Sequence, residues 1–144
     1  MSVSDRLKVL REEKAAANLK AAEMFLAENA TKQGVVVLSS GLQYQILVDG
    51  NGEKPALHHV VTCHYHGTLI NGEVFDSSVK RGRPASFPVN GVIKGWVEAL
   101  KLMPVGSKWR LFLHPNLGYG DKQVSALIGP NCALIFDVEL ISFQ

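Results

Sequence analysis

The sequence has few cysteines and no long apolar run, and each absence narrows the possible classes of protein. Cys63 and Cys132 are the two cysteines among 144 residues, and both lie in apolar, strand-like runs. They could pair only if the fold brings them together, which their spacing cannot show, and we expect buried thiols in a reducing compartment. No apolar run approaches the roughly 18 residues of a membrane span, so we expect a soluble protein with no membrane partner.

A strong charge of either sign is also lacking. The 15 basic and 13 acidic residues give a net charge of +2 and are spread along the chain, which is too weak and too mixed for a nucleic-acid surface. The first residues are polar and charged, with neither the apolar segment nor the cleavage site of a signal peptide. We therefore expect no nucleic-acid partner and a cytoplasmic location, or a periplasmic or secreted one if an upstream segment has been removed.

The sequence offers little for metal, nucleophilic or nucleotide chemistry. His64 and His66 would share one face of a strand while Cys63 faces the other way, so at most two metal ligands converge locally and we expect no metal. The serines lack the nucleophile elbow G-x-S-x-G, and no histidine is marked as a partner base. The glycines form neither a P-loop nor a dinucleotide fingerprint, so no cofactor is expected.

Residues 5 to about 30 contain no glycine or proline and are rich in helix-forming residues, which predicts one long helix with Ser4 as its N-cap. A helix of about 25 residues spans roughly 37 Å, longer than a small domain needs. It either projects and meets a partner, or is a solvated helix docked only through Met24, Phe25 and Leu26. Its apolar stripe is Ala15, Leu19, Ala22 and Leu26.

After Gly34 the pattern changes to alternating and β-branched runs separated by turn residues, which predicts strands. Asn71 and Gly72 are expected to close a hairpin as a type I′ turn, and a short helix is expected over about 92–101. We expect an α+β fold: a long N-terminal helix and linker (1–33), then a curved antiparallel β-sheet wrapped over the short helix (34–144). The expected strands cover 35–38, 42–48, 60–69, 108–113 and 133–143.

Aromatic and aliphatic side chains recur through the second part of the chain around one carboxylate, Asp76. Taken singly, each could simply fill the core of a small domain. Taken together, with no nucleophile, base pair or metal cage, they favour chemistry that works by shape and desolvation. The set is Tyr65, Phe75, Phe87, Trp96, Tyr119 and Phe136, with Val92 and Ile93.

The order and spacing of these residues resemble the FK506-binding-protein family of peptidyl-prolyl cis-trans isomerases (rotamases, EC 5.2.1.8) over about residues 40–144. The preceding helix, with the blocks at 87–90 and 102–109, resembles the macrophage infectivity potentiator subgroup, in which a long helix links the isomerase domain to an N-terminal dimerisation region. The blocks that carry the family resemblance are Tyr65, Phe75-Asp76-Ser77-Ser78, Arg81, Pro84, Val92-Ile93, Gly95-Trp96, Met103, Val105-Gly106, Tyr119-Gly120 and Phe136-Asp137-Val138-Glu139-Leu140.

The resemblance implies a role for each position. Trp96 would lie under the substrate's proline ring, the Tyr119 hydroxyl and the Ile93 N–H would donate to substrate carbonyls, and Asp76 would orient the substrate amide and brace Tyr65 or Arg81. Catalytic roles would fall to Tyr65, Asp76 and Tyr119. The other substrate-binding positions would be Phe75, Phe87, Val92, Ile93, Trp96, Leu127, Ile128 and Phe136.

Implied partners are proline-containing polypeptides, macrolides such as FK506 or rapamycin, and a second copy that dimerises through the N-terminal helix. Two departures from the family pattern stand out. Ala85 replaces an aromatic residue common in small relatives, and the loop 121–130 lacks a glycine-rich run and paired prolines. Two alternatives to a folding isomerase therefore stay open: a proline-motif or macrolide-binding chaperone module with little catalysis, and an interaction protein that works through its helix.

Overall fold

The computed structural model describes residues 2–144, and its first element is the predicted long helix, α1 (Val3–Asn29). Ser2 is the N-cap, so the expectation of Ser4 is wrong. The Ser2 hydroxyl accepts from the Asp5 N–H at 3.1 Å, and the Asp5 carboxylate accepts from the Ser2 N–H at 3.2 Å. This reciprocal capping box satisfies two N–H groups at the start of the helix, and it begins α1 two residues before the predicted start.

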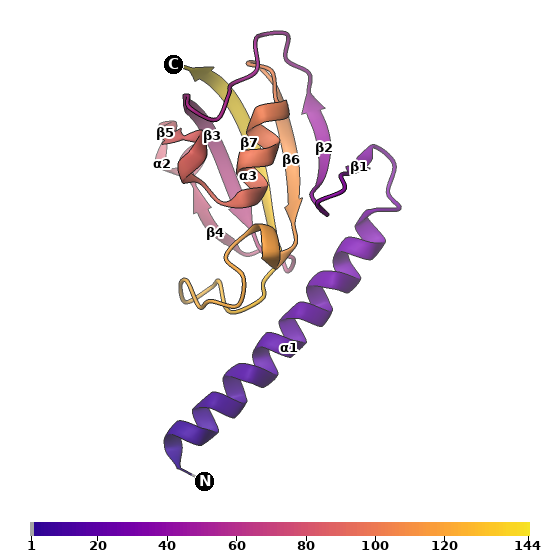
Figure 1. The fold of residues 1–144 in the computed structure, drawn as a ribbon, viewed down its shortest axis with the longest axis vertical. Coiled ribbons are helices and arrows are strands. Elements are labelled where there is room, and N and C mark those ends of the chain that lie inside the picture. The colour runs from indigo at the N-terminus through magenta and orange to yellow at the C-terminus, as the bar shows by residue number, and fades with distance from the viewer. Residues whose placement is uncertain (1) are drawn as a thin grey trace.

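Seven strands form one antiparallel sheet (Figure 1). The order is β1-β2-β6-β7-β3-β4, and β5 pairs with the end of β3 that β4 leaves free. The predicted fold class, a long helix followed by an antiparallel sheet with a short helix, is confirmed. The strands are Val35–Val37 (β1), Gln43–Val48 (β2), Val60–Thr68 (β3), Val74–Ser77 (β4), Ala85–Pro88 (β5), Lys108–Leu113 (β6) and Leu134–Phe143 (β7).

Strand β3 shows why the alternating pattern was informative. Val61, Cys63 and Tyr65 are buried on the inner face, and the residues between them are half-buried on the outer face. Cys63 is a free thiol whose pKa burial raises to about 12. Cys132 is also free and is half-buried, so the two cysteines are not paired.

The hairpin between β3 and β4 has a different turn from the one predicted. The Leu69 carbonyl accepts from the Gly72 N–H at 3.0 Å, so residues 70 and 71 are central. Gly72 has a φ of 91°, whereas Asn71 is not in the left-handed region that a type I′ turn requires at both positions. Instead, the Asn71 side chain accepts from the Glu73 N–H at 2.9 Å, and Gly72 supplies the single left-handed residue.

Helix α3 (Lys94–Leu102) covers the inner face of the sheet, where Trp96, Ala99 and Leu100 are buried. It begins later than predicted because the short turn η1 (Val89–Gly91) precedes it and Val92–Ile93 is extended. A Cβ added to Gly95 would lie 2.6 Å from Leu113, so glycine lets the helix approach the sheet closely. Two further short elements are α2 (Ser78–Arg81) and η2 (Pro115–Leu117).

The C-terminal half of α1 packs against the outer face of the sheet, opposite α3. Leu26 is buried, and the rings of Phe25 and Phe112 lie 6.2 Å apart. The buried Asn29 amide donates to the Gln43 side-chain carbonyl at 2.8 Å, which satisfies both polar groups inside the contact. These contacts fix the helix against β2 and β6.

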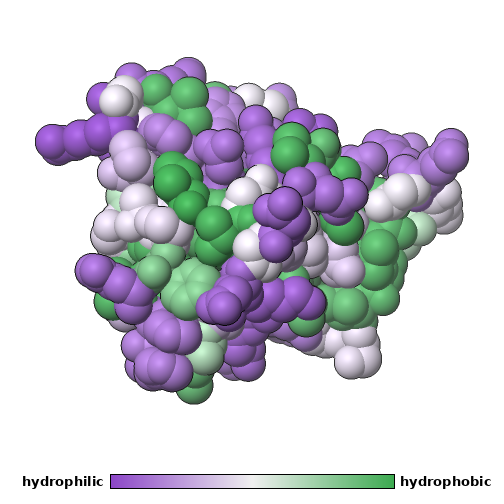
Figure 2. Space-filling view, turned by 90° about the horizontal axis from the view of Figure 1, so that it is seen from above, coloured by the Kyte–Doolittle hydropathy of each residue, from purple (hydrophilic) through white to green (hydrophobic). Residues whose placement is uncertain are grey.

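The N-terminal half of α1 extends away from the sheet (Figure 1), and residues 3–14 are exposed. Met24 is 64% exposed, so the expectation that it docks is wrong: it lies on the solvent side of the helix. Among residues 2–144, no helix is both long and apolar enough to cross a membrane. On the face shown in Figure 2, apolar surface forms separate patches among hydrophilic side chains.

Candidate functional site

A cavity of about 450 Å³ lies beside α3 on the inner face of the sheet. This volume is within the usual range for small-ligand sites. The cavity brings together every residue predicted for the site except Leu127. Its predicted lining residues are Tyr65, Phe75, Asp76, Phe87, Val92, Ile93, Trp96, Tyr119, Ile128 and Phe136.

Trp96 is the centre of the aromatic cluster. Its indole lies 5.5 Å from the ring of Tyr65, 5.6 Å from Phe87 and 5.2 Å from Phe136, with interplanar angles of 77°, 80° and 89°. Such edge-to-face pairs stabilise one another beyond their buried area, by about 0.5–1.5 kcal/mol each. The indole is 4% exposed and held on three sides, so it is a rigid apolar floor.

Gly67 makes room for one wall of the cavity, and the sequence analysis did not identify it. A Cβ added there would lie 2.6 Å from the Phe75 ring and 3.0 Å from the Phe136 ring. These two rings meet at 5.4 Å and 89° beside the glycine. A glycine in the interior of an alternating strand signals a close approach, and this signal was available in the sequence.

Asp76 on β4 is the carboxylate of the cavity and is held from two sides. The Tyr65 hydroxyl donates to Asp76 Oδ2 at 2.5 Å, and the Arg81 guanidinium pairs with Asp76 Oδ1. Arg81 also donates to the Tyr65 hydroxyl oxygen at 2.8 Å. Strand β4 supplies the carboxylate and the short helix α2 supplies the arginine, and α2 begins directly after the last residue of β4, Ser77.

These contacts fix the protonation states of the pair. Burial raises the pKa of Asp76, but the hydrogen bonds from Tyr65 and Arg81 outweigh burial and hold this pKa below its usual value of 3.8. Burial, with the hydrogen bond to Asp76, raises the pKa of Tyr65 above 10. At neutral pH the carboxylate is therefore charged and the phenol is protonated.

The rim of the cavity comes from the irregular segment after η2. Tyr119 lies there and is 37% exposed, so its hydroxyl group is accessible to a ligand. Val124 and Ser125 line the cavity as well, although the sequence analysis did not assign them to the site. No regular pattern marks residues 118–133, which is why single positions in the segment could not be assigned.

Leu127 does not line the aromatic cavity. It is 40% exposed and lines a separate cavity of about 270 Å³, bordered by α1 and by the turn between β3 and β4. Its neighbour Ile128 points into the aromatic cavity and is 5% exposed. The chain bends at residues 125–127, and the two neighbouring side chains therefore enter different cavities.

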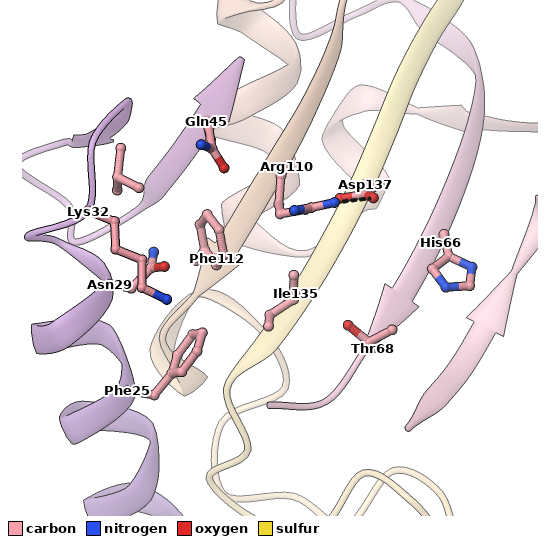
Figure 3. A pocket seen from close by; sticks show the side chains of 11 residues that line it. Phe25, Asn29, Lys32, Gln45, His66, Thr68, Arg110, Phe112, Ile135 and Asp137 are labelled. Carbon is pink, nitrogen blue, oxygen red and sulfur yellow. Dashed lines mark hydrogen bonds and ion pairs between the residues drawn. The ribbon is translucent and has the colours of Figure 1, made fainter. Parts of the chain in front are cut away.

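A larger cavity, about 560 Å³, lies on the outer face of the sheet beside α1 (Figure 3). Its most ordered polar feature is the ion pair between Arg110 and Asp137, with two hydrogen bonds of 2.7 and 3.0 Å. Its polar groups are mixed in kind, and it is lined by two aromatic rings, Phe25 and Phe112, against six in the cavity on the inner face. The cavity on the inner face, where aromatic rings converge on one anchored carboxylate, is therefore the candidate site.

The histidines of β3 have structural partners. His64 Nδ1 lies 2.9 Å from Ser78 Oγ, and His66 Nδ1 lies 2.9 Å from Ser77 Oγ. Ser78 also accepts from the Tyr65 N–H at 2.7 Å. These contacts tie the start of α2 to β3 and so support Asp76 and Tyr65.

A sequence model described as "FKBP-type peptidyl-prolyl cis-trans isomerase" matches residues 51–141, and a second, "Domain amino terminal to FKBP-type peptidyl-prolyl isomerase", matches residues 1–46. The first match covers most of the chain and contains the whole aromatic cavity. The chain belongs to the family of FKBP-type peptidyl-prolyl cis-trans isomerases.

Comparisons with individual proteins support the same family. The chain is 50% identical to the peptidyl-prolyl cis-trans isomerase Mip of Coxiella burnetii over 127 residues (88% of this chain, 55% of that protein). It is 52% identical to the "Outer membrane protein MIP" of Legionella longbeachae over 131 residues (91% and 56%). The crystal structure of FkpA from Escherichia coli superposes with a TM-score of 0.94 at 40% identity, covering 99% of this chain and 66% of that one. The chain thus spans little more than half the length of these two curated relatives.

Proposed function

We propose that this chain accelerates cis-trans rotation about X-Pro peptide bonds in polypeptides. One observation carries the proposal: a rigid indole floor, walled by aromatic rings, lies beside a single carboxylate that is fixed by two hydrogen-bond donors. Membership of the isomerase family supports the same activity. The cavity suits a five-membered proline ring, which presents apolar faces and lacks an N–H to satisfy.

The chemistry needs no proton transfer. Rotation about a peptide bond has a barrier of about 18–20 kcal/mol because resonance keeps the amide planar. In the twisted state the C–N bond loses double-bond character and the carbonyl loses dipole, so a dry cavity favours the twisted state over the planar one. Lowering the barrier by roughly 5–6 kcal/mol would speed rotation about 10⁴-fold, at 1.36 kcal/mol per factor of ten.

We assign the roles accordingly. Trp96 lies under the proline ring, and the ring walls exclude water. The Tyr119 hydroxyl and the Ile93 N–H donate to the substrate carbonyls and hold the peptide while the bond turns. Asp76, kept charged by Arg81, orients the substrate amide and fixes the Tyr65 ring against the floor.

The experiment is a protease-coupled or exchange-NMR assay on a Leu-Pro peptide with wild type, Tyr119→Phe and Tyr44→Phe. Tyr44 is a matched control because its ring stacks on Trp109 at 4.1 Å and does not line the cavity. We expect wild type to catalyse, Tyr119→Phe to lose roughly 2- to 12-fold in kcat/KM, the effect of one neutral hydrogen bond, and Tyr44→Phe to match wild type. Peptide or macrolide binding with no acceleration by wild type would instead support the binding-module alternative.

The long helix supports a second proposal, a dimer. The exposed half of α1 carries Val3, Leu7 and Leu10, spaced by four and three residues along one side and 73%, 55% and 59% exposed. We propose that a second copy covers this side. Sedimentation of wild type should show a concentration-dependent mass, and Leu7→Glu with Leu10→Glu should abolish it. The control Lys20→Ala, on the same helix, should not, and a monomer at every concentration would contradict the proposal.

Two further assignments remain proposals. We divide the chain into a helix and linker over 1–33 and an isomerase domain over 34–144, which is tested by whether 34–144 folds cooperatively by itself. For location, the name of the Legionella longbeachae relative supports a site outside the cytoplasm over the cytoplasmic alternative. Fractionation of cells that naturally produce the protein separates the two locations.

A further inference from the structure

The irregular segment 118–133 is the loop between η2 and β7 (Figure 1). It supplies one wall of the aromatic cavity. Its residues Val124, Ser125 and Ile128 face the cavity, and two hydrogen bonds join them. The Val124 N–H donates to the Ile128 carbonyl at 2.9 Å, and the Ile128 N–H donates to Ser125 Oγ at 3.1 Å. The wall is therefore a small unit whose position sets the width of the cavity.

Directly after Ile128, the segment rests on α1. The Asn18 side-chain amide donates to the Pro130 carbonyl at 2.8 Å, and the Asn131 amide donates to the Ala15 carbonyl at 3.2 Å. Both bonds are partly buried and join residues more than a hundred positions apart in sequence. The wall is thus attached to a helix that lies outside the sheet and does not line the cavity.

The Tyr119 end of the segment is also held at Asn131. The Asn131 N–H donates to the carbonyl of Gly120, the residue after Tyr119, at 2.8 Å. Asn131 has a φ of 57°, the left-handed conformation that asparagine tolerates better than most residues. A shift of Asn131 would therefore move the Tyr119 end and the Ile128 end of the wall together.

We propose that Asn18 of α1 is a positioning residue for the substrate cavity. It holds the wall at Pro130, so a bound peptide meets a loop that is already ordered. Without this hydrogen bond the loop samples other positions, and the substrate binds only the molecules whose loop is in the competent position. The apparent affinity is then the intrinsic affinity multiplied by the fraction of such molecules. The indole floor and Asp76 do not change, so kcat is largely kept. This proposal rests on the proposed isomerase function.

The test compares Asn18→Asp and Asn18→Ala with wild type. Aspartate has the shape of asparagine but cannot donate to a carbonyl, and Lys20→Ala is the control on an exposed position of the same helix. We expect both Asn18 variants to raise KM for a Leu-Pro peptide roughly 2- to 12-fold, the effect of one hydrogen bond, with kcat within about twofold of wild type. Amide hydrogen exchange in 121–131 should quicken, while Lys20→Ala matches wild type in both readouts.

Unchanged KM and unchanged loop exchange in both Asn18 variants would overturn the proposal. So would a lower Tm with KM unchanged, because Asn18 would then serve stability alone. If the proposed isomerase function itself is wrong, the wild-type protein will not accelerate isomerisation, and this result is distinct from a failure of the Asn18 proposal. In that case, peptide binding followed by tryptophan fluorescence and loop exchange still decide the role of Asn18.

Discussion

At the scale of single residues, the site depends on one anchored charge within an aromatic enclosure. Asp76 faces the cavity, yet its side chain is 43% exposed, and a flexible carboxylate there would be free to turn toward water. The Tyr65 hydroxyl and Arg81 prevent this by holding one oxygen each. The orientation of Asp76 is therefore a property of three residues from β3, β4 and α2.

Replacing Asp76 by Asn should reduce kcat/KM by roughly 10- to 160-fold, because the hydrogen bond proposed between the substrate amide and the charged carboxylate would contribute about 1.5–3 kcal/mol. Asn keeps the shape and removes the charge, so a steric cause is excluded. Exchange NMR on an X-Pro peptide measures the loss. Wild-type activity in this variant would show that the carboxylate is not used.

The pKa shifts predict a flat pH profile. Asp76 has a folded pKa below 3.8, so its charged form, and the stability that form contributes, is present above this value and is lost as the pH falls through the folded pKa. Tyr65 has a pKa raised above 10, so its hydroxyl stays a donor well past neutrality. We expect kcat/KM to vary little between about pH 6 and 8. A bell-shaped profile centred in this range would be inconsistent with the mechanism.

Gly67→Ala should move the Phe75 ring out of place, since the new Cβ would lie 2.6 Å from it. We expect weaker peptide binding and a loss of stability of about 1–3 kcal/mol, as for other overpacked sites. Gly72→Ala is a comparison in which the added Cβ has open space and only the φ of 91° opposes it. Equal binding by wild type and Gly67→Ala would contradict the packing account.

At the scale of elements, the strong patterns were predictive and the weak ones were not. The alternation in β3 repeats over nine residues, and α1 is a long run of helix-forming residues without glycine or proline, so single exceptions did not matter in either element. The four-residue helix α2 and the four-residue strand β5 are too short to show a period. Helix α2 is held because Ser77 and Ser78 hydrogen-bond to the histidines of β3. Strand β5 forms because it pairs with the end of β3 that β4 leaves free.

The attachment of α1 can be tested by two substitutions that lie two residues apart, on opposite sides of the helix. Leu26→Ala should lower the free energy of unfolding by about 2–5 kcal/mol, because Leu26 is 6% exposed against the sheet. Met24→Ala should change it by less than about 0.5 kcal/mol, because Met24 is 64% exposed. Urea denaturation measures both. Equal effects would mean that α1 does not pack as described.

At the scale of the whole molecule, α1 and the sheet form two connected parts with different surfaces. The C-terminal half of the helix packs one side against the outer face, and the N-terminal half extends into solvent with an apolar edge. The cavity lies on the opposite face, beside the N-terminal end of α3. Through Asn18 and Asn131, the helix nevertheless reaches the loop that closes the cavity.

The sequence predicted which residues line the cavity better than it predicted the contacts that hold the loop of the cavity in place. Trp96 and Tyr65 belong to an ordered motif, so a resemblance located them. Val124, Ser125 and the contacts of Asn18 depend on how an irregular loop meets a helix more than a hundred residues away in sequence, and no local pattern encodes such a meeting. Leu127 was misplaced for the same reason.

The most direct test of the central claim is the rate of cis-trans exchange of a Leu-Pro peptide with the wild-type protein in H₂O and in D₂O. If the cavity acts by shape and desolvation, the protein accelerates exchange in both solvents and the ratio of the rates is close to one. An exchange rate equal to that in buffer would contradict the proposed activity. Acceleration with a ratio of about two or more would contradict the mechanism, because a proton would then move in the rate-limiting step.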